Sequence, residues 1–245
     1  MAEDARQPYN SRMTIIYEIA IRAHAEHVDE IRRWFEARPS QAWRALSGLE
    51  EFHAYFPAEG RAEDPYVDDG IGPAALCKLG FVDAEALREA IGSAAFRYGL
   101  AKLLPEATVT AEPMRRKFYG RGGEVSGGTL HAPFSYVVRY HRPAEDERAF
   151  IENYIATHPS LLATLPNIRS VLCYFPIARE IGWQDPNGLA SPDYMIGNEV
   201  VFDSITHFNA AMVTPIRHEL RRHFREFPAF SGRNTHHPMD RIRLV

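Results

Sequence analysis

The second half of the chain shows the clearest alternation between strand-like and helix-like patterns of apolar residues. Residues 134–140 are aromatic or β-branched at most positions, which predicts a strand. Pro143 and the acidic residues 145–147 indicate the start of a helix, in which apolar side chains recur at helical spacing up to Pro166. The rest of the pattern predicts strands at 168–175, 199–202 and 240–245 and a helix from Ser204 to about 224. The order of elements is therefore β-α-β-β-α-β.

The first half predicts the same order of elements. Its strands are expected at 14–21, 51–56, 75–82 and 108–118, and its helices at 28–46 and 84–103. This order is the split βαβ, or ferredoxin-like, unit, in which both helices cover one face of a four-stranded sheet. The other face needs apolar cover, and two such units can supply it to each other. The predicted fold class is α+β, with two tandem ferredoxin-like (βαββαβ) domains forming an intrachain α/β-barrel pseudo-dimer.

The chain also repeats itself at an offset close to 120 residues. The dipeptide Pro-Ser at 39–40 recurs at 159–160, and the tripeptide Tyr-Phe-Pro at 55–57 recurs at 174–176. A glycine-rich, strand-averse stretch at 120–128 separates the two copies. Such regular self-similarity predicts a tandem duplication. The expected domains are 12–119, a degenerate ferredoxin-like copy; 120–132, a linker; and 133–245, a ferredoxin-like domain that resembles the family described next.

The first helix of the second half carries a recognisable motif. Residues 150–162 contain His158 directly before a proline, and the sequence Leu-Pro-Asn-Ile at 165–168 leads into the next strand. This segment resembles the helix-to-strand signature of EthD-like proteins, which belong to the dimeric α/β-barrel superfamily. Tyr154 stands where that family often has tryptophan, and the first half has Arg38 where the histidine would be. The resemblance implies His158 as a site residue.

The same resemblance implies a group of activities. Its relatives include cofactor-independent isomerases, decarboxylases and monooxygenases, and also accessory proteins, so the fold alone does not select one. We expect an enzyme that acts on a small ring-containing organic compound by histidine acid/base chemistry, without a bound cofactor. The aromatic residues of the second half favour a pocket for an apolar ring.

Histidine and tyrosine residues are the candidates for this chemistry. Eight of the eleven histidines lie in the second half, and His158 is the candidate general acid or base because histidine titrates near neutral pH. Strand alternation places Tyr136 and Tyr140 on one face and Arg139 on the other, which favours the two tyrosines as pocket residues. The other aromatic residues expected to bind substrate are Tyr154, Tyr174 and Trp183. Trp183 lies on a long loop that is predicted to act as a lid.

Two other functions stay open. One is a non-catalytic accessory protein that binds a small ligand. The other is a haem-binding protein of chlorite dismutase-like architecture, with His207 or His218 as the iron ligand. The basic helix segment 217–225 is interpreted as a solvated face, with contact to an anionic ligand as the alternative.

The spacing of the remaining histidines and cysteines does not predict a metal site. His236 and His237 are adjacent and would face opposite ways in a strand, and His218 and His223 are off the spacing that aligns two ligands on a helix. The roles of these four residues and of His207 are left open. Cys173 is interpreted as a small buried residue of a strand, and the two cysteines lack the spacing of a zinc site.

Composition and charge limit the classes of molecule that the protein is expected to bind. Hydrophobic residues make up 45% and charged residues 24% of the 245 positions, as in an ordinary globular protein. A net charge of −4 provides no basic field for nucleic acid or anionic lipid, and no apolar run reaches the ~18 residues of a membrane span. A polar N-terminus and only two cysteines favour a cytoplasmic protein. The expected partner is a small organic molecule, and a homodimer is left open.

Overall fold

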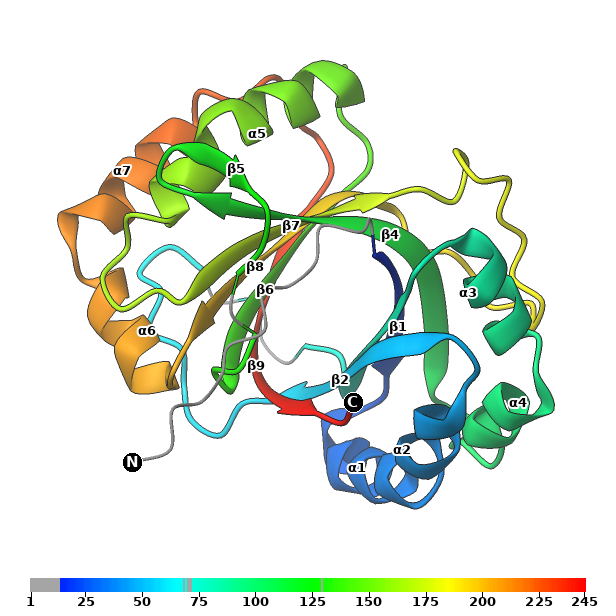
Figure 1. Ribbon diagram of the computed structural model, residues 1–245. Coiled ribbons are helices and arrows are strands. Elements are labelled where there is room, and N and C mark those ends of the chain that lie inside the picture. The colour runs from blue at the N-terminus through cyan, green and yellow to red at the C-terminus, as the bar shows by residue number, and fades with distance from the viewer. Residues whose placement is uncertain (1–13, 68, 70–71, 129) are drawn as a thin grey trace, which may run out of the picture.

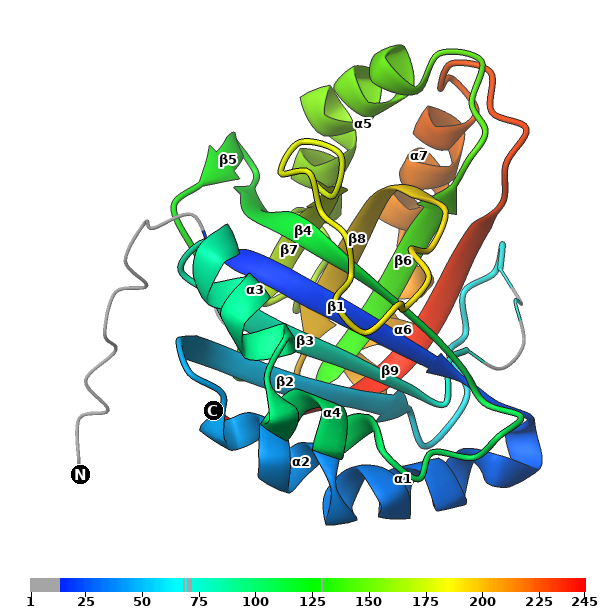
Figure 2. The same ribbon diagram turned by 90° about the vertical axis from the view of Figure 1, so that its right-hand side faces the viewer.

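The strands predicted in both halves close into one barrel in the computed structural model, which describes residues 14–67, 69, 72–128 and 130–245 (Figures 1 and 2). The strands are β1 (Ile15–Arg22), β2 (Leu49–Pro57), β3 (Ala75–Phe81), β4 (Thr108–Gly120), β5 (Gly123–Val125), β6 (Phe134–His141), β7 (Ser170–Pro176), β8 (Tyr194–Phe202) and β9 (Asn234–Arg243). Within the described residues they are ordered β1-β3-β2-β9-β6-β8-β7-β4-β5, and β1 also pairs with β4. The protein is therefore α+β, with an eight-stranded antiparallel β-barrel and a short ninth strand.

Each half of the chain supplies four neighbouring strands to this barrel. The first half contributes β4-β1-β3-β2 and the second half contributes β9-β6-β8-β7. The two sets meet where β2 pairs with β9 and where β4 pairs with β7, both antiparallel. Every edge strand of one half is thereby covered by a strand of the other half, which removes the exposed edges of an open sheet.

The helices lie outside the barrel and are shorter than the sequence predicts. They are α1 (Val28–Ala37), α2 (Pro39–Ala42), α3 (Ala84–Ile91), α4 (Ala94–Leu100), α5 (Glu147–Leu162), α6 (Ile205–Met212) and α7 (Pro215–Phe224). The two helices expected in the first half break before Pro39, which has no N–H to donate, and at Ser93, whose hydroxyl caps α4. In the second half Ser204 caps α6 as predicted, but a new helix begins at Pro215. Among the described helices, none is both long and apolar enough to cross a membrane.

Part of the glycine-rich segment after β4 forms a short strand, contrary to the sequence prediction. Residues 123–125 turn back as β5 and pair with the end of β4. Gly123 adopts a φ of 111°, a conformation that glycine tolerates and other residues rarely adopt, so the tight turn needs this residue. Strands β8 and β9 also begin earlier than the apolar pattern predicts, because polar residues such as Asn198 and His237 are buried in the fold.

Ion pairs fill the interior of the barrel. Lys78 contacts Glu199 and lies 3.8 Å from Glu18, while Arg139 Nε donates to Glu18 at 3.0 Å. Arg241 lies 3.4 Å from Glu199, and all five side chains are buried. Burial by itself would raise the pKa of Glu199, but Lys78 and Arg241 hold that pKa well below its usual value. These groups therefore form a paired, charged core.

The outer face of the first-half sheet is packed with large aromatic side chains. Trp43 stacks on Phe96 with ring centroids 5.0 Å apart, and its indole N–H donates to the Phe96 carbonyl at 3.1 Å. A Cβ added at Gly99 would lie 2.1 Å from Trp43 Nε1, so this packing requires glycine there. Trp183, on the loop between β7 and β8, adds its ring 5.6 Å from that of Tyr17. The loop of the second half thus covers the first half.

Candidate functional site

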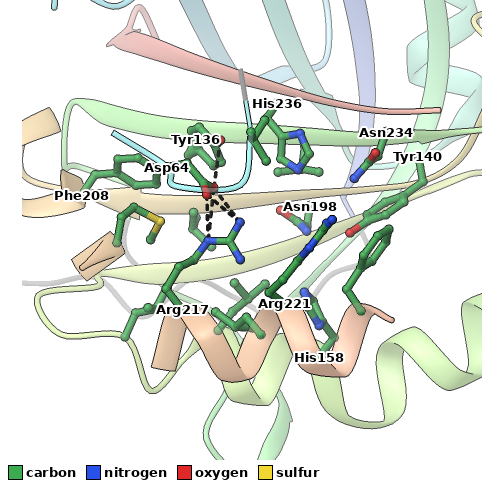
Figure 3. Close-up of a pocket in the computed structure, with 18 residues that line it drawn as sticks. Asp64, Tyr136, Tyr140, His158, Asn198, Phe208, Arg217, Arg221, Asn234 and His236 are labelled. Atoms are coloured by element: carbon green, nitrogen blue, oxygen red, sulfur yellow. Dashed lines mark hydrogen bonds and ion pairs between the residues drawn. The ribbon is translucent and has the colours of Figure 1, made fainter. Parts of the chain in front are cut away.

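A pocket opens on the outer face of the second-half sheet, between β6, β8 and β9 on one side and α5, α6 and α7 on the other (Figure 3). It contains about 610 Å³ of empty space, part of which is open to solvent. Its apolar walls are Val67, Val138, Leu162, Leu165, Val200, Phe208, Met212, Leu220 and Phe224. Its polar lining consists of Asp64, Tyr136, Tyr140, His158, Asn198, Arg217, Arg221, Asn234 and His236. An apolar pocket with a few converging polar groups is the usual form of a small-molecule site.

Helix α5 places His158 at one wall of this pocket. Asp146 accepts from the backbone N–H of Ala149 and fixes the start of the helix, and Phe150, Tyr154 and His158 follow four residues apart on its buried face. His158 is 6% exposed, and its Nδ1 lies 3.2 Å from Nδ1 of His223. One of these two nitrogens must carry a proton that the other accepts.

Burial sets the protonation state of His158. Removal from water, together with the charges of His223 and Arg217, lowers the pKa of His158 to about 3. The imidazole is therefore neutral at pH 7. A neutral imidazole offers one lone pair as a proton acceptor, which is the form a general base requires.

Strand β6 presents Tyr136 and Tyr140 to the pocket from one face of the sheet. The Tyr136 hydroxyl donates to Asp64 Oδ2 at 3.3 Å, and burial together with Asp64 raises the pKa of Tyr136. Burial also raises the pKa of Tyr140, although Arg217 and Arg221 oppose this shift. Among the described residues, the Tyr140 hydroxyl has no hydrogen-bond partner. Both phenols are protonated near neutral pH, and that of Tyr140 is free to donate to a ligand.

Helix α7 contributes two arginines, one turn apart on the same face. Arg217 makes a two-pronged ion pair with Asp64, with N–O distances of 2.7 to 3.2 Å. Arg221 lies over the rings of Tyr66 and Phe224, and its buried Nε has no hydrogen-bond partner within the described part of the chain. The pocket therefore holds one neutralised guanidinium and one that lacks a counter-ion among the described residues.

The loop between β2 and β3, which belongs to the first half, reaches across to cover this pocket. Its Asp64 pairs with Arg217, its Tyr66 contacts His218, and the carboxylate of Asp69 lies 2.8 Å from Nδ1 of His236. The sequence pattern instead predicts the Trp183 loop as the lid. That loop lies over the first half, because the two halves exchange the loops that follow their second strands.

The structure brings together only some of the candidate residues, within the regions it describes. Tyr136, Tyr140 and His158 line the pocket. Tyr154 lies behind this lining, where its hydroxyl accepts from Nδ2 of Asn198. The Tyr174 hydroxyl points into the barrel and donates to Glu199 at 2.9 Å, and Trp183 packs in the first half. Tyr174 and Trp183 therefore do not contribute to this pocket.

Several pocket residues are missed by the sequence reasoning. They are Asp64, Asn198, Arg217, Arg221, Asn234 and His236. Asp64 comes from the other half and no local pattern marks it. The spacing of Arg217, Leu220 and Arg221 was a usable signal, since it places two arginines beside a buried leucine on one helical face. The interpretation of this helix segment as a solvated face, to which contact with an anionic ligand is the alternative, therefore does not hold for these two arginines, which line the pocket.

The other candidates for metal, haem or thiol chemistry lie elsewhere. His207 is 45% exposed at its side chain near Asp203, and His218 contacts Tyr66, so neither lines the pocket. Neither residue is therefore placed to ligate a group bound in this pocket. Burial raises the pKa of the Cys173 thiol, which disfavours the thiolate form that a nucleophile requires. In the described ranges, no cluster of three or more His, Cys, Asp or Glu side chains is arranged to hold a metal ion.

Comparison with known proteins identifies the fold. No protein-family model and no curated protein matches the sequence. An anthrone oxidase-like protein superposes with a TM-score of 0.64 at 10% identity, over 94% of this chain and 92% of the other. A "putative monooxygenase" from Lactobacillus acidophilus NCFM gives 0.54 at 10% identity over 95% of each chain. A "putative chlorite dismutase" gives 0.50 at 8% identity, over 95% of this chain and 96% of the other.

These identities are too low to carry an activity across, but the superpositions span nearly the whole of each chain. This chain shares the fold of these structural neighbours. The class of protein is thereby defined by its barrel and by a pocket between sheet and helices. Its chemistry has to be argued from the residues of that pocket.

Proposed function

We propose that the protein is an enzyme of the EthD-like group that moves a proton on a small, ring-containing organic molecule, with His158 as general acid and base. The observation that supports this most is a neutral, buried imidazole at the wall of an apolar pocket, with an unpaired phenol hydroxyl from Tyr140 on the same lining. The pocket suits a planar apolar ring because Val138, Val200 and Phe224 form its walls.

The contact between His158 and His223 suggests how the base is oriented. If Nδ1 of His158 donates to Nδ1 of His223, the lone pair of His158 lies on Nε2, which has no hydrogen-bond partner within the described residues. Nε2 then takes a proton from the bound substrate, whose electron pair remains on the substrate as an enolate or phenolate. Donation from the Tyr140 hydroxyl stabilises that anion. Return of the proton from Nε2 to another atom of the substrate completes an isomerisation without a cofactor.

The low pKa of His158 restricts the substrates this base can serve. A base with a pKa of about 3 removes protons efficiently only from groups that are themselves acidic. A C–H between two carbonyl groups, a C–H between a carbonyl group and an aromatic ring, or a phenolic O–H meets that condition. The proposed substrate therefore forms a delocalised anion.

We also propose that residues 12–119 and 133–245 are two copies of one ferredoxin-like unit. The identical strand order of the halves supports this, as does a matching pair of contacts. Tyr17 of β1 donates to Asp185 of the β7–β8 loop, and Tyr136 of β6 donates to Asp64 of the β2–β3 loop. In this view the later copy keeps the site, and the earlier copy is scaffold. Residues 12 and 13 lie outside the described residues.

A test of the catalytic proposal uses 2-tetralone, a ring ketone with acidic C–H bonds, as the probe. In D₂O the wild-type protein is expected to accelerate deuterium incorporation next to the carbonyl, followed by NMR. His158→Gln removes this acceleration, while His131→Gln, an exposed histidine of the same half, retains it. Equal acceleration by the His158 and His131 variants would contradict the assignment of His158.

The 2-tetralone experiment, together with an absorption spectrum, separates the alternative functions. Binding of 2-tetralone without any deuterium incorporation favours a non-catalytic accessory protein. A Soret band in the absorption spectrum after addition of haem favours the haem-binding alternative. That alternative has no support from His207 and His218, because neither residue lines the pocket.

A further inference from the structure

We infer that the pocket selects substrates that already carry a negative charge, such as a ring carboxylate, and that Arg221 is the residue that binds this charge. The inference rests on the proposed function in one respect, namely that this pocket takes a small ring-containing molecule. It adds the charge of that molecule and the residue that recognises it.

The charges that line the pocket do not balance. Arg217 and Arg221 are both on the lining, and Asp64 is the one carboxylate among the described lining residues. Asp64 is 3% exposed at its side chain and is fully engaged with Arg217. The neighbouring Asp69 is engaged with His236. Within the described structure, Arg221 is thus left as an uncompensated positive charge facing the pocket.

The hydrogen bonding of Arg221 also is incomplete. Its Nε is buried and has no partner in the described structure. A buried donor without an acceptor is costly, more so on a charged group. A carboxylate satisfies such a guanidinium with two parallel hydrogen bonds, and this geometry suits arginine. The unmet donor therefore matches the acceptor that a carboxylate would bring.

Other polar groups face the same space. In Figure 3 the Arg221 side chain reaches from α7 toward the sheet, and Asn198 and Tyr140 line the same pocket. The side-chain oxygen of Asn198 is buried and has no hydrogen-bond partner in the described ranges. The rings of Tyr66 and Phe224, 5.6 and 5.5 Å from the Arg221 guanidinium carbon, hold the charged group in place. Arg221 is therefore positioned before any ligand arrives.

A bound anion would also act on the base. The positive charge of Arg217 is one of the causes that lower the pKa of His158. A negative charge placed nearby opposes that effect and favours the protonated imidazole that forms during proton transfer. Charge recognition by Arg221 and proton acceptance by His158 therefore support each other.

The test compares 2-naphthoate with its neutral analogue 2-naphthamide, each titrated into the full-length protein by calorimetry. Wild type is expected to bind 2-naphthoate roughly tenfold or more tightly than 2-naphthamide, the size expected for hydrogen bonds to a charged group. Arg221→Gln loses this preference and leaves the affinity for 2-naphthamide within about twofold. Arg222→Gln, on the exposed side of the same helix, behaves as wild type. Unfolding curves confirm that each variant is folded.

The outcomes distinguish the two proposals. If 2-naphthamide binds wild type as tightly as 2-naphthoate, the charge selection is wrong while the ring pocket stands. If Arg221→Gln keeps the preference for 2-naphthoate, Arg221 is not the residue responsible and the inference is overturned. If neither compound binds, the small-molecule pocket fails and the inference fails with it.

Discussion

The two halves of the barrel have the same arrangement of sheet and helices, but one half is filled by side chains and the other contains a pocket. On the first half, Trp43, Phe96 and Trp183 fill the space between sheet and helices. On the second half, the corresponding space is open and lined by Tyr140, His158 and other polar side chains. The arrangement of sheet and helices therefore does not determine whether a pocket is present. The volume of the side chains between sheet and helices determines it.

The exchange of loops makes each half depend on the other. The β7–β8 loop brings Trp183 and Asp185 to the first half, where Trp183 adds to an apolar core. The β2–β3 loop brings Asp64 to the second half, where it neutralises Arg217. Trp183 fills space in the first half. Asp64 leaves the pocket of the second half open and reduces its positive charge. The site is thus a product of both halves, although its catalytic candidate comes from one.

The largest expected difference between the halves concerns packing. Phe96→Ala should cost about 3–5 kcal/mol of unfolding free energy, because Phe96 is fully buried against Trp43 and its loss leaves a cavity. Phe224→Ala removes the same side chain from the wall of an existing pocket and should cost less than about 2 kcal/mol. Urea unfolding of both variants measures this. Equal losses would mean that the second half is packed as tightly as the first.

The next largest difference concerns the exchanged loops. Asp64→Asn leaves Arg217, 11% exposed at its side chain, without its counter-ion, which should cost about 2–4 kcal/mol. Asp185→Asn keeps one oxygen that accepts from the backbone N–H groups of Asn187 and Leu189, and its amide N–H can donate to the Tyr17 hydroxyl. Its cost should therefore stay near ~1 kcal/mol or below. The comparison uses unfolding at neutral pH. A larger loss for Asp185→Asn would reverse the roles assigned to the two loops.

A third expected effect is a loss of folding stability at acidic pH, caused by His158 of the second half. The pKa of His158 is about 3 in the folded protein against 6.5 as its ordinary value, so above pH 6.5 the residue is neutral in both states and adds no pH dependence. Below pH 6.5 the unfolded chain takes up a proton that folded His158 refuses. Stability should then fall by about 1.4 kcal/mol per pH unit from this residue, roughly 2 kcal/mol by pH 5.

Replacement of His158 by Phe removes that slope. The difference in unfolding free energy between wild type and His158→Phe should therefore shift by about 2 kcal/mol in favour of the variant between pH 7 and pH 5. His131→Phe, at an exposed position, serves as the control and should keep the wild-type slope. Parallel curves for wild type and His158→Phe would show that His158 is accessible to protons and not buried as described.

The smallest expected effect comes from restoring the missing histidine of the first half. Arg38→His should change stability by less than about 0.5 kcal/mol, since Arg38 packs on the exposed ring of Tyr98. It should also create no second binding site, because Trp43 and Phe96 occupy the space where a ligand would lie. Calorimetric titration with 2-naphthoate should still give one site per chain. A second site would mean that the histidine, and not the cavity, is the limiting feature.

The sequence predicted the barrel class better than it predicted the site. Apolar alternation in segments such as 134–140 marked the strands, since strand periodicity is a local property of the chain. The same alternation correctly placed Tyr136 and Tyr140 on the face opposite Arg139. Helix ends were partly missed at Pro39 and Pro215, where a proline starts a new helix and does not simply end the old one.

The remaining site residues depend on contacts that no local pattern encodes. Asp64 and Arg217 are 153 positions apart and meet because two loops are exchanged between halves. Trp183 looked like a lid residue because it lies on a long loop, but loop length does not tell which half the loop covers. Tyr174 is a strand residue whose face was not resolved from sequence, and it points into the charged barrel interior.

The most direct test is a crystal structure with 6-bromo-2-naphthoate, in which the anomalous signal of bromine locates the ligand without bias. One bromine position per chain is expected, between α7 and the outer face of β6 and β8. The carboxylate should lie within hydrogen-bond distance of Arg221, and no bromine should lie beside Trp43. Bromine in the first half, or on the surface away from His158, would contradict the proposed site.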